Sequence, residues 1–299
     1  MKITVLGSSA GLPTAERGLP AVLVEVEGEL LLFDCGEGTQ RQMMKAGASL
    51  GKRMKIFITH LHGDHLFGLP GMVQTMNLMN RAHPLDVYGP PGLDEFIEET
   101  TLSSMSTPSF ELSVHEVAEG EIFNGRKYLV EGAWADHSKP SMAYRLTFGA
   151  SRGRILPKRV AALGIPEGPL LKELKDGKSV VLESGRIVHP VEVLGEPIRG
   201  KVLVYSGDTR PTASVERLAM GADMLVHEAT FSSELAGRAE ADGHSTAEGA
   251  AQLAARAGVK RLILTHISSR YHSTDALLGE ARGIFPDAEV ADDLKTYFL

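Results

Sequence analysis

Three histidines and an aspartate fall within six positions of the segment THLHGDH, between His60 and His65. The chain has only 11 histidines in 299 residues, so this clustering points to a shared task. Residues two apart in an extended chain face the same way, so His60 and His62 can bind one cation. Beyond a turn at Gly63, Asp64 and His65 can face a second cation. Neutral imidazoles and carboxylates are ligands that suit zinc or a similar divalent ion.

Three more ligand-type residues follow apolar segments further along the chain. His137 comes after EGAWAD, Asp208 ends the predicted strand VLVYSG, and His266 ends the predicted strand RLILT. Strand ends are rigid supports for side chains that face a cleft. Seven candidates match two cations that share one carboxylate and one water. We therefore assign His60, His62 and His137 to one cation, Asp64, His65 and His266 to the other, and Asp208 to both.

The segments that must position these residues show strand and helix patterns. Apolar strand patterns cover residues 2–7, 21–36 (a hairpin about 27–29), 55–60, 141–149, 201–208, 223–230 and 261–266. Helical spacing covers residues 38–47, 92–105, 211–220 and 246–258. Hairpins predominate in the first half, whereas strands alternate with helices in the second. Two sheets packed face to face, with helices outside, accommodate both halves in an α/β fold.

Residues 151–200 interrupt this pattern. The stretch contains seven glycines and five prolines, which are typical of an inserted, partly irregular arm. Between Ser151 and Lys201 there are ten Lys and Arg against six Asp and Glu, a net charge of +4 in a chain whose total is −7. A basic arm on an acidic body fits a polyanionic partner, and a solvated face would have the same composition.

Composition excludes several classes of protein. Hydrophobic residues make up 43% of the chain and charged residues 23%, and no run approaches the roughly eighteen apolar residues of a membrane span. The segment MKITVLGSSAGLP begins as a strand, with too short an apolar part for a signal peptide. The single cysteine, Cys35, excludes an internal disulfide and is expected to be a buried strand-end residue, not a metal ligand. We expect a cytoplasmic protein with no membrane partner.

The metal-ligand pattern resembles a known superfamily. THLHGDH resembles the HxHxDH signature of the metallo-β-lactamase superfamily, whose further metal positions match His137, Asp208 and His266. FDCGEG (33–38) resembles the superfamily's Asp-x-Gly turn, which supports the metal loop. In order, THLHGDHLFGLPG (59–71), SGDTRP (206–211), HEATF (227–231), GHST (243–246) and THISSRY (265–271) resemble the ribonuclease Z family of tRNA 3′-processing endonucleases. The resemblance covers nearly the whole chain.

This resemblance implies a fold and a cofactor. The fold would be a four-layer αβ/βα sandwich of two packed sheets, the metallo-β-lactamase fold, formed as a single domain over 1–299. The inserted substrate-binding arm would lie at approximately 151–200. The cofactor would be two Zn²⁺ per chain, with Mn²⁺ or another divalent ion as the alternative.

The resemblance also implies an activity. The chain would be a zinc-dependent endoribonuclease that cuts the 3′ trailer from precursor tRNA and leaves a 3′-hydroxyl on the tRNA. Asp64 is expected to accept the proton of the attacking water while it binds its metal. His244 is expected to protonate the departing ribose oxygen, with Glu228 orienting the imidazole. A plainer interpretation of His244 stays open, in which it only precedes a helix cap at Ser245 and Thr246.

Substrate binding is expected to involve the arm and two loops. LGIPEGPLLKELKDGKSV (163–180) resembles the Gly-Pro arm with which family members hold the tRNA body, and the family implies a homodimer in which one subunit's arm serves the other's site. Ser268 and Arg270 follow His266 and are expected to bind phosphate; an ion pair of Arg270 with a carboxylate is the alternative.

The loop LPTAERG (12–18) departs from its family motif, Pro-x-Lys-x-Arg-Asn. Pro13 and Arg17 are retained, and we expect Arg17 to contact the substrate. Ala15 and Gly18 stand where the motif has Lys and Asn. Because this loop reads the 3′ end of the substrate in the family, the response to a CCA end stays open.

Two other functions compete with this interpretation. The first is another dinuclear-metal phosphodiesterase or an arylsulfatase-like hydrolase that acts on small molecules. The second is a metal-free homologue that serves as a binding subunit. The basic arm and the pair of His244 and Glu228 disfavour the first, because a small substrate needs no clamp. The second is disfavoured because all seven ligand positions are filled.

Overall fold

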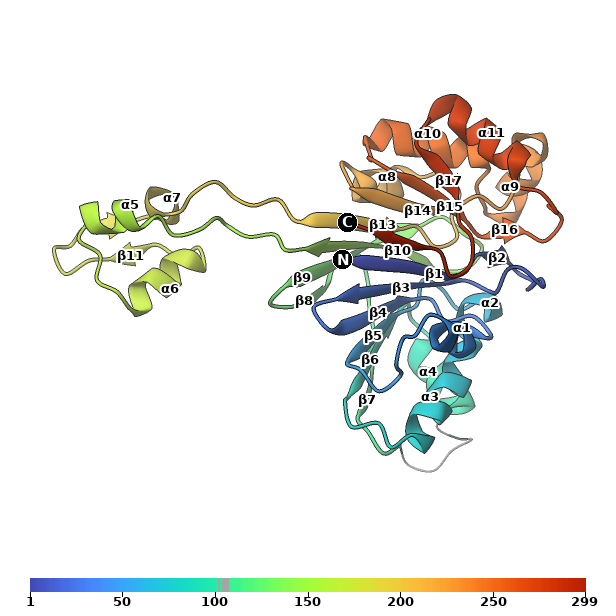
Figure 1. The fold of residues 1–299 in the computed structure, drawn as a ribbon, viewed down its shortest axis with the longest axis horizontal. Coiled ribbons are helices and arrows are strands. Elements are labelled where there is room, and N and C mark those ends of the chain that lie inside the picture. The colour runs from blue at the N-terminus through green and yellow to red at the C-terminus, as the bar shows by residue number, and fades with distance from the viewer. Residues whose placement is uncertain (102, 104–107) are drawn as a thin grey trace. The chain divides into compact units, whose positions relative to one another are not determined.

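The computed structural model describes residues 1–101, 103 and 108–299, and these form two compact units (Figure 1). The core unit contains Met1–Asn124, Leu129–Leu146 and Val202–Leu299, and the arm unit contains Gly125–Tyr128 and Thr147–Lys201. Among the helices described, none is long and apolar enough to cross a membrane.

The first large sheet of the core unit is mixed. Within the described residues its strand order is β18-β1-β3-β4-β5-β6-β7. The strands are β1 (Lys2–Gly7), β3 (Ala21–Val26), β4 (Glu29–Phe33), β5 (Met54–Phe57), β6 (Leu85–Gly89), β7 (Leu112–Glu116) and β18 (Thr296–Phe298). Strands β18, β1, β3 and β4 pair antiparallel, whereas β4, β5, β6 and β7 pair in parallel.

The prediction that hairpins predominate in the first half is therefore wrong between β4 and β7. Parallel neighbours need crossover connections, and helices supply them here. These helices are α1 (Thr39–Lys45), α2 (Gly63–Leu66), α3 (Gly68–Leu78) and α4 (Leu93–Thr100). The helix predicted over 92–105 coincides with α4, and its last part includes residues 102, 104 and 105, which lie outside the described residues.

The second large sheet has the order β17-β15-β14-β13-β10-β9-β8 within the described residues. Its strands are β8 (Gly120–Asn124), β9 (Tyr128–Ala135), β10 (Ser141–Phe148), β13 (Lys201–Tyr205), β14 (Met224–Glu228), β15 (Leu262–Thr265) and β17 (Ala288–Val290). Strands β13, β14, β15 and β17 run parallel, as the alternation of strands and helices predicts. The helices of this half are α8 (Ala213–Ala219), α9 (Ala236–Asp242), α10 (Ala247–Ala257) and α11 (Asp275–Ile284), with a 3₁₀ turn at Ser233–Leu235. A short parallel pair joins β2 (Ser9–Ala10) to β16 (Ile267–Ser268).

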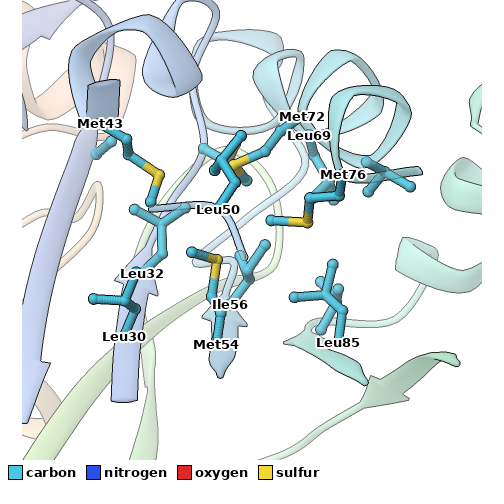
Figure 2. Close-up of a cluster of buried hydrophobic side chains, with 14 of the residues drawn as sticks. Leu30, Leu32, Met43, Leu50, Met54, Ile56, Leu69, Met72, Met76 and Leu85 are labelled. Carbon is cyan, nitrogen blue, oxygen red and sulfur yellow. The ribbon is translucent and has the colours of Figure 1, made fainter. Parts of the chain in front are cut away.

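The two sheets pack face to face through aromatic side chains. Phe33 and Phe57 of the first sheet meet Tyr144 of the second, with ring centroids 6.0 and 5.6 Å apart. Helices cover the outer faces: Figure 2 shows methionines of α1 and α3 packed over leucine and isoleucine side chains of β4 and β5. The alanine-rich helix α10 covers the second sheet. A buried Leu, Ile or Met contributes about 1.5–3 kcal/mol, so the packing of helices on both sheets stabilises the core unit. The architecture is the predicted four-layer αβ/βα sandwich.

The arm unit has a small hydrophobic core of its own. It contains α5 (Pro157–Ala162), α6 (Pro169–Lys175), α7 (Pro190–Val193) and the two-residue strands β11 (Val180–Val181) and β12 (Ile187–Val188). Each helix begins with a proline, whose fixed φ suits the first helical position. The core is formed by Val160, Ile165, Leu174, Val180, Val188, Val193 and Leu194.

Candidate functional site

The predicted metal loop follows β5. His60 and His62 lie between the end of β5 and α2, and α2 carries Asp64 and His65. A Cβ on Gly63 would lie 2.4 Å from a ring carbon of Phe67, so a larger residue there would require this ring to move.

The turn after β4 holds this loop in place. Asp34 has a left-handed backbone (φ 60°), and the N–H of Cys35 donates to the carbonyl of His65 (2.8 Å). A Cβ on Gly36 would lie 2.3 Å from the carbonyl oxygen of Asp64. The Asp-x-Gly segment therefore packs directly against the backbone of the metal loop. Cys35 itself is fully buried, and burial raises the pKa of its thiol.

The other predicted ligands reach the same place from the second sheet. His137 follows β9, Asp208 follows β13, and His266 follows β15. Three overlapping groups of potential ligand atoms result among the described residues, and within each group the atoms lie within 4.8 Å of one another. The first contains His60, His62, His137 and Asp208, the second Asp64, His65 and His266, and the third Asp208, His244 and His266. The structure thus brings all seven predicted residues together: the first two groups correspond to the two assigned sets, and Asp208 belongs to the first and third groups.

Asp208 lies between the first two groups. Its Oδ2 is 3.6 Å from His60 Nε2 and 4.0 Å from His137 Nε2 in the first group. The same oxygen is 3.3 Å from Nε2 of both His65 and His266 in the second. A carboxylate in this position can serve both groups.

The outward ring nitrogens of two histidines contact groups that only accept hydrogen bonds. His65 Nδ1 lies 2.7 Å from Oδ2 of Asp34, and His137 Nδ1 lies 2.7 Å from the carbonyl of Gly243. Both Nδ1 atoms therefore carry hydrogen and donate it, which turns the Nε2 lone pairs inward. Donation from the outer nitrogen to a carboxylate or carbonyl is typical of metal-bound histidine.

Burial and charge shift the pKa values of the cluster strongly. Burial lowers the pKa of His60 well below its ordinary value, and the neighbouring His65 acts in the same direction. Burial alone would also lower the pKa of His65, but the carboxylates of Asp208 and Asp34 raise it well above its ordinary value. Burial would raise the pKa of Asp208, and the adjacent His266 and His65 imidazoles hold it well below its ordinary value. A bound cation would take the place of the proton on His65.

The donor set fits divalent cations. Inward-facing nitrogens lie close together, with His60 Nε2 3.0 Å and His137 Nε2 3.1 Å from His62 Nδ1. Lone pairs that converge in this way need a proton or a cation between them. The Oδ1 atom of Asp208 is buried and accepts no hydrogen bond from the described residues. A buried carboxylate oxygen without a donor is costly unless a cation is its partner. The cluster is thus suited to divalent metal ions.

His244 and Glu228 form a pair beside this cluster. His244 Nδ1 lies 2.9 Å from Oε1 of Glu228 and 4.0 Å from Oδ2 of Asp208. Burial alone would lower the pKa of His244, but the Glu228 carboxylate raises it to about 9. The helix cap is made by Thr246, whose hydroxyl accepts from the N–H of Gly249.

His244 also falls within ligand distance of Asp208 and His266. Its Nδ1, however, faces a carboxylate that is itself hydrogen-bonded by the N–H of Thr209 (2.8 Å). The neighbouring His227 contacts the carbonyl of Glu228 through Nδ1, and its Nε2 has no hydrogen bond within the described residues.

The three predicted substrate-binding residues lie outside the cluster. Arg17 donates from Nη1 to the hydroxyl of Ser8 (2.6 Å) and the carbonyl of Ala291 (2.5 Å). Arg17 and Ser268 line one cavity of about 670 Å³. Arg270 donates from Nε to Ser268 Oγ (3.0 Å), and its guanidinium lies 4.9 Å from the ring centroid of Phe231. Arg17 therefore has a structural contact with residues near the C-terminus, whereas Arg270 stays exposed.

Several residues of the site were missed by sequence reasoning. The N–H of Gly11 donates to Oδ2 of Asp64 (2.9 Å), and the threonines Thr59 and Thr230 each contact a ligand histidine. Thr59 and Thr230 stand inside THLHGDHLFGLPG and HEATF, so their places next to predicted site residues were the available signal.

Comparison with known proteins places this geometry in a family. Two family models match: "Anti-Pycsar protein Apyc1" over residues 1–148 and "Beta-lactamase superfamily domain" over residues 177–267. A ribonuclease Z from Methanothermobacter thermautotrophicus is 47% identical over 296 residues, which cover 99% of this chain and 96% of that protein. A ribonuclease Z from Methanosarcina acetivorans is 42% identical and covers 98% and 96%.

Solved structures agree with this placement. The short form of human tRNase Z matches with a TM-score of 0.71 and 30% identity, over 100% of this chain and 99% of that one. A metallo-β-lactamase fold protein from Bacillus subtilis has a TM-score of 0.73 at 18% identity, over 99% and 98%, which is a likeness of fold alone. Relatives above 40% identity that align over nearly the full length share more than a fold. The chain belongs to the ribonuclease Z family of the metallo-β-lactamase superfamily.

Proposed function

We propose that this protein is a zinc-dependent endoribonuclease that removes the 3′ trailer from precursor tRNA and leaves a 3′-hydroxyl on the tRNA. The observation that carries the proposal is the His244–Glu228 pair beside seven convergent ligand residues, in a chain of this family. The pair matters because a ribose oxygen leaves poorly unless it is protonated.

The proposed cofactor is a pair of Zn²⁺ ions, with Mn²⁺ or another divalent ion as the alternative. His60, His62 and His137 would hold one, Asp64, His65 and His266 the other, and Asp208 both. When bound, two such cations acidify water and neutralise the charge of the phosphodiester.

The chain's own residues move the protons. Asp64 accepts the proton of the attacking water, and the N–H of Gly11 holds its Oδ2 at 2.9 Å. As the water oxygen bonds to phosphorus, the bond from phosphorus to the ribose 3′ oxygen breaks. His244 gives its proton to that oxygen, so the tRNA ends in a 3′-hydroxyl and the trailer keeps the phosphate. Glu228 holds the imidazole in the protonated form and in one orientation.

We expect elemental analysis of the purified protein to find about two zinc-like ions per chain. The reason is that two sets of buried and half-buried ligands converge, and a buried carboxylate oxygen of Asp208 has no donor among the residues that the structure describes. Removal with a chelator should abolish cleavage, and added zinc should restore it. Protein that cleaves precursor tRNA while free of transition metal would contradict this expectation.

The direct test of the function uses a precursor tRNA with a 3′ extension. The purified protein should release the trailer, and mapping of the cut should place a 3′-hydroxyl on the tRNA. A small-molecule hydrolase of the same fold would leave this precursor intact and would show little dependence of its affinity on salt.

The arm unit is proposed to bind the tRNA body, in a homodimer in which it serves the partner's site. Its exposed lysines include Lys158, Lys172, Lys175 and Lys178. Each contact between such a residue and a phosphate releases about one counterion. The logarithm of the binding constant then falls more steeply with the logarithm of the salt concentration, by about 0.9 in slope per contact.

Deletion of residues 155–195 should therefore weaken precursor binding and flatten its salt dependence. Hydrolysis of bis(p-nitrophenyl) phosphate and the metal content should survive, because the seven ligand residues belong to the core unit. Replacement of Lys172, Lys175 and Lys178 by alanine should flatten the slope partly. A deletion that binds tRNA normally, or loses its zinc, would refute this division of roles.

A further inference from the structure

Thr59 connects a buried carboxylate to a ligand histidine. Its hydroxyl lies 3.0 Å from Oδ2 of Asp34 and 3.0 Å from Nδ1 of His60. A carboxylate only accepts, so the single hydroxyl hydrogen goes to Asp34. The hydroxyl oxygen then accepts from His60, which places hydrogen on Nδ1 and a lone pair on Nε2.

Thr230 makes the same connection on the other side of the cluster. Its hydroxyl lies 2.7 Å from Oε2 of Glu228 and 2.8 Å from Nδ1 of His266. The hydroxyl hydrogen goes to Glu228, and the oxygen accepts from His266. The lone pair of His266 Nε2 therefore faces Asp208, 3.3 Å from its Oδ2.

Each carboxylate also contacts a second histidine directly. Asp34 accepts from His65 Nδ1 at 2.7 Å, and Glu228 accepts from His244 Nδ1 at 2.9 Å. Asp34 therefore orients one histidine in each metal group, directly and through Thr59. Glu228 orients the acid directly and a metal ligand through Thr230.

The surroundings keep the Thr59 hydroxyl in this place. Thr59 is fully buried, and its carbonyl accepts from the N–H of Met142 at 2.8 Å. Gly207 has φ +58°, and a Cβ there would lie 2.8 Å from Cβ and Cγ2 of Thr59. The residue before Asp208 thus packs on the threonine side chain. Thr230 is 4% exposed, and its own N–H also points to Glu228.

We propose that Thr59 and Thr230 are positioning residues that set the tautomer of one metal ligand each, Thr59 for the group of His60 and Thr230 for the group of His266. The inference rests on the proposed two-metal centre. Both hydroxyls would act through a histidine and not by binding the metal themselves. A mutation of one threonine should therefore affect one metal position and leave the other unchanged.

The test replaces each threonine by valine, which keeps the branched shape and removes the hydroxyl. Zinc affinity is measured by competition with a chelator, and Co²⁺ absorption follows the two positions in turn. Loss of an orienting partner typically costs about 10–100-fold in metal affinity. Thr59→Val should weaken the binding of one zinc equivalent by this factor, and Thr230→Val should weaken the binding of the other. The double variant should weaken the binding of both.

Matched variants separate positioning from packing. Thr4 is also buried, and its hydroxyl lies 3.1 Å from that of Thr296 in the neighbouring strand, so Thr4→Val should leave the affinity of both zinc equivalents unchanged. Thr59→Ser and Thr230→Ser should restore affinity because they return the hydroxyl. If a valine variant proves unstable, Asp34→Asn provides a second measurement, since Asn tolerates the left-handed backbone of this position. It should weaken both equivalents.

Valine variants with wild-type affinity at both equivalents, or with losses at the same equivalent, would overturn the inference. Losses that serine does not restore would do so as well, because they would reflect packing. Wild-type protein that binds fewer than two cations would instead defeat the proposed two-metal centre, which is a separate outcome.

Discussion

Asp208→Ala is expected to remove at least one metal equivalent and to lower cleavage of precursor tRNA by more than about 100-fold. The carboxylate lies between both ligand groups, with Oδ2 3.3 Å from Nε2 of His65 and of His266 and 3.6 Å from Nε2 of His60. Removal of a group that only orients a metal ligand typically lowers metal affinity or activity about 10–100-fold. Removal of a shared ligand should lower both further. Its loss also leaves two cations without the negative charge between them.

Asp223→Ala is the matched control for this variant. Asp223 is also buried and precedes β14, at the opposite ends of the parallel strands from Asp208. It accepts from the N–H of Val202 and pairs with Lys260. Its loss should lower stability and leave metal content intact. An Asp208→Ala variant that keeps two metals and near-normal activity would show that the bridging assignment is wrong.

His244→Ala is expected to slow cleavage of precursor tRNA by about 10²–10⁴-fold, the usual contribution of general acid catalysis. The departing ribose oxygen is strongly basic and needs a proton as its bond to phosphorus breaks. A nitrophenolate leaves without one, so hydrolysis of bis(p-nitrophenyl) phosphate should be much less impaired. Both metals should remain bound. Glu228→Ala should follow the same pattern more mildly, since Glu228 acts through the imidazole.

The two rates are to be measured side by side for each variant. His115→Ala is the control, because His115 also pairs with a carboxylate, Asp86 at 3.1 Å, and lies outside every motif. It should change neither rate. A parallel loss on both substrates in His244→Ala would mean that His244 is not the acid. A loss of metal would mean that it is a ligand, as its distance from Asp208 and His266 also permits.

Much of the fold followed from local patterns. The alternation of strands and helices from 201 onward was recognised, and it is typical of the parallel pairing that the second sheet shows. The parallel half of the first sheet was missed, since a strand pattern is the same for both pairing directions. The crossover helices decide the direction: helical spacing was recognised for α1 and α4, but the crossover from β5 to β6, which contains α2 and α3, was not. The prediction that Arg17 contacts substrate stays a prediction, and its partners Ala291 and Asp292, some 275 positions away, could not be inferred from local patterns.

The sequence by itself determined which side chains converge. Seven ligand-type residues at strand ends and in one short motif were named from residue type and spacing, and all seven lie in the cluster. Their roles stay predictions. Local chemistry sufficed here because strand ends are rigid and a metal site needs several such residues.

Tertiary structure alone decided how each histidine is held. Asp34 meets Thr59 and His65 from a neighbouring strand end and Tyr205 from the other sheet, 171 positions away. Thr230 meets His266 across 36 positions. Hydrogen bonds of this kind form only when separate elements are placed to within a few tenths of an ångström of the required distance. No spacing along the chain encodes them, and they exist only once the two sheets have packed.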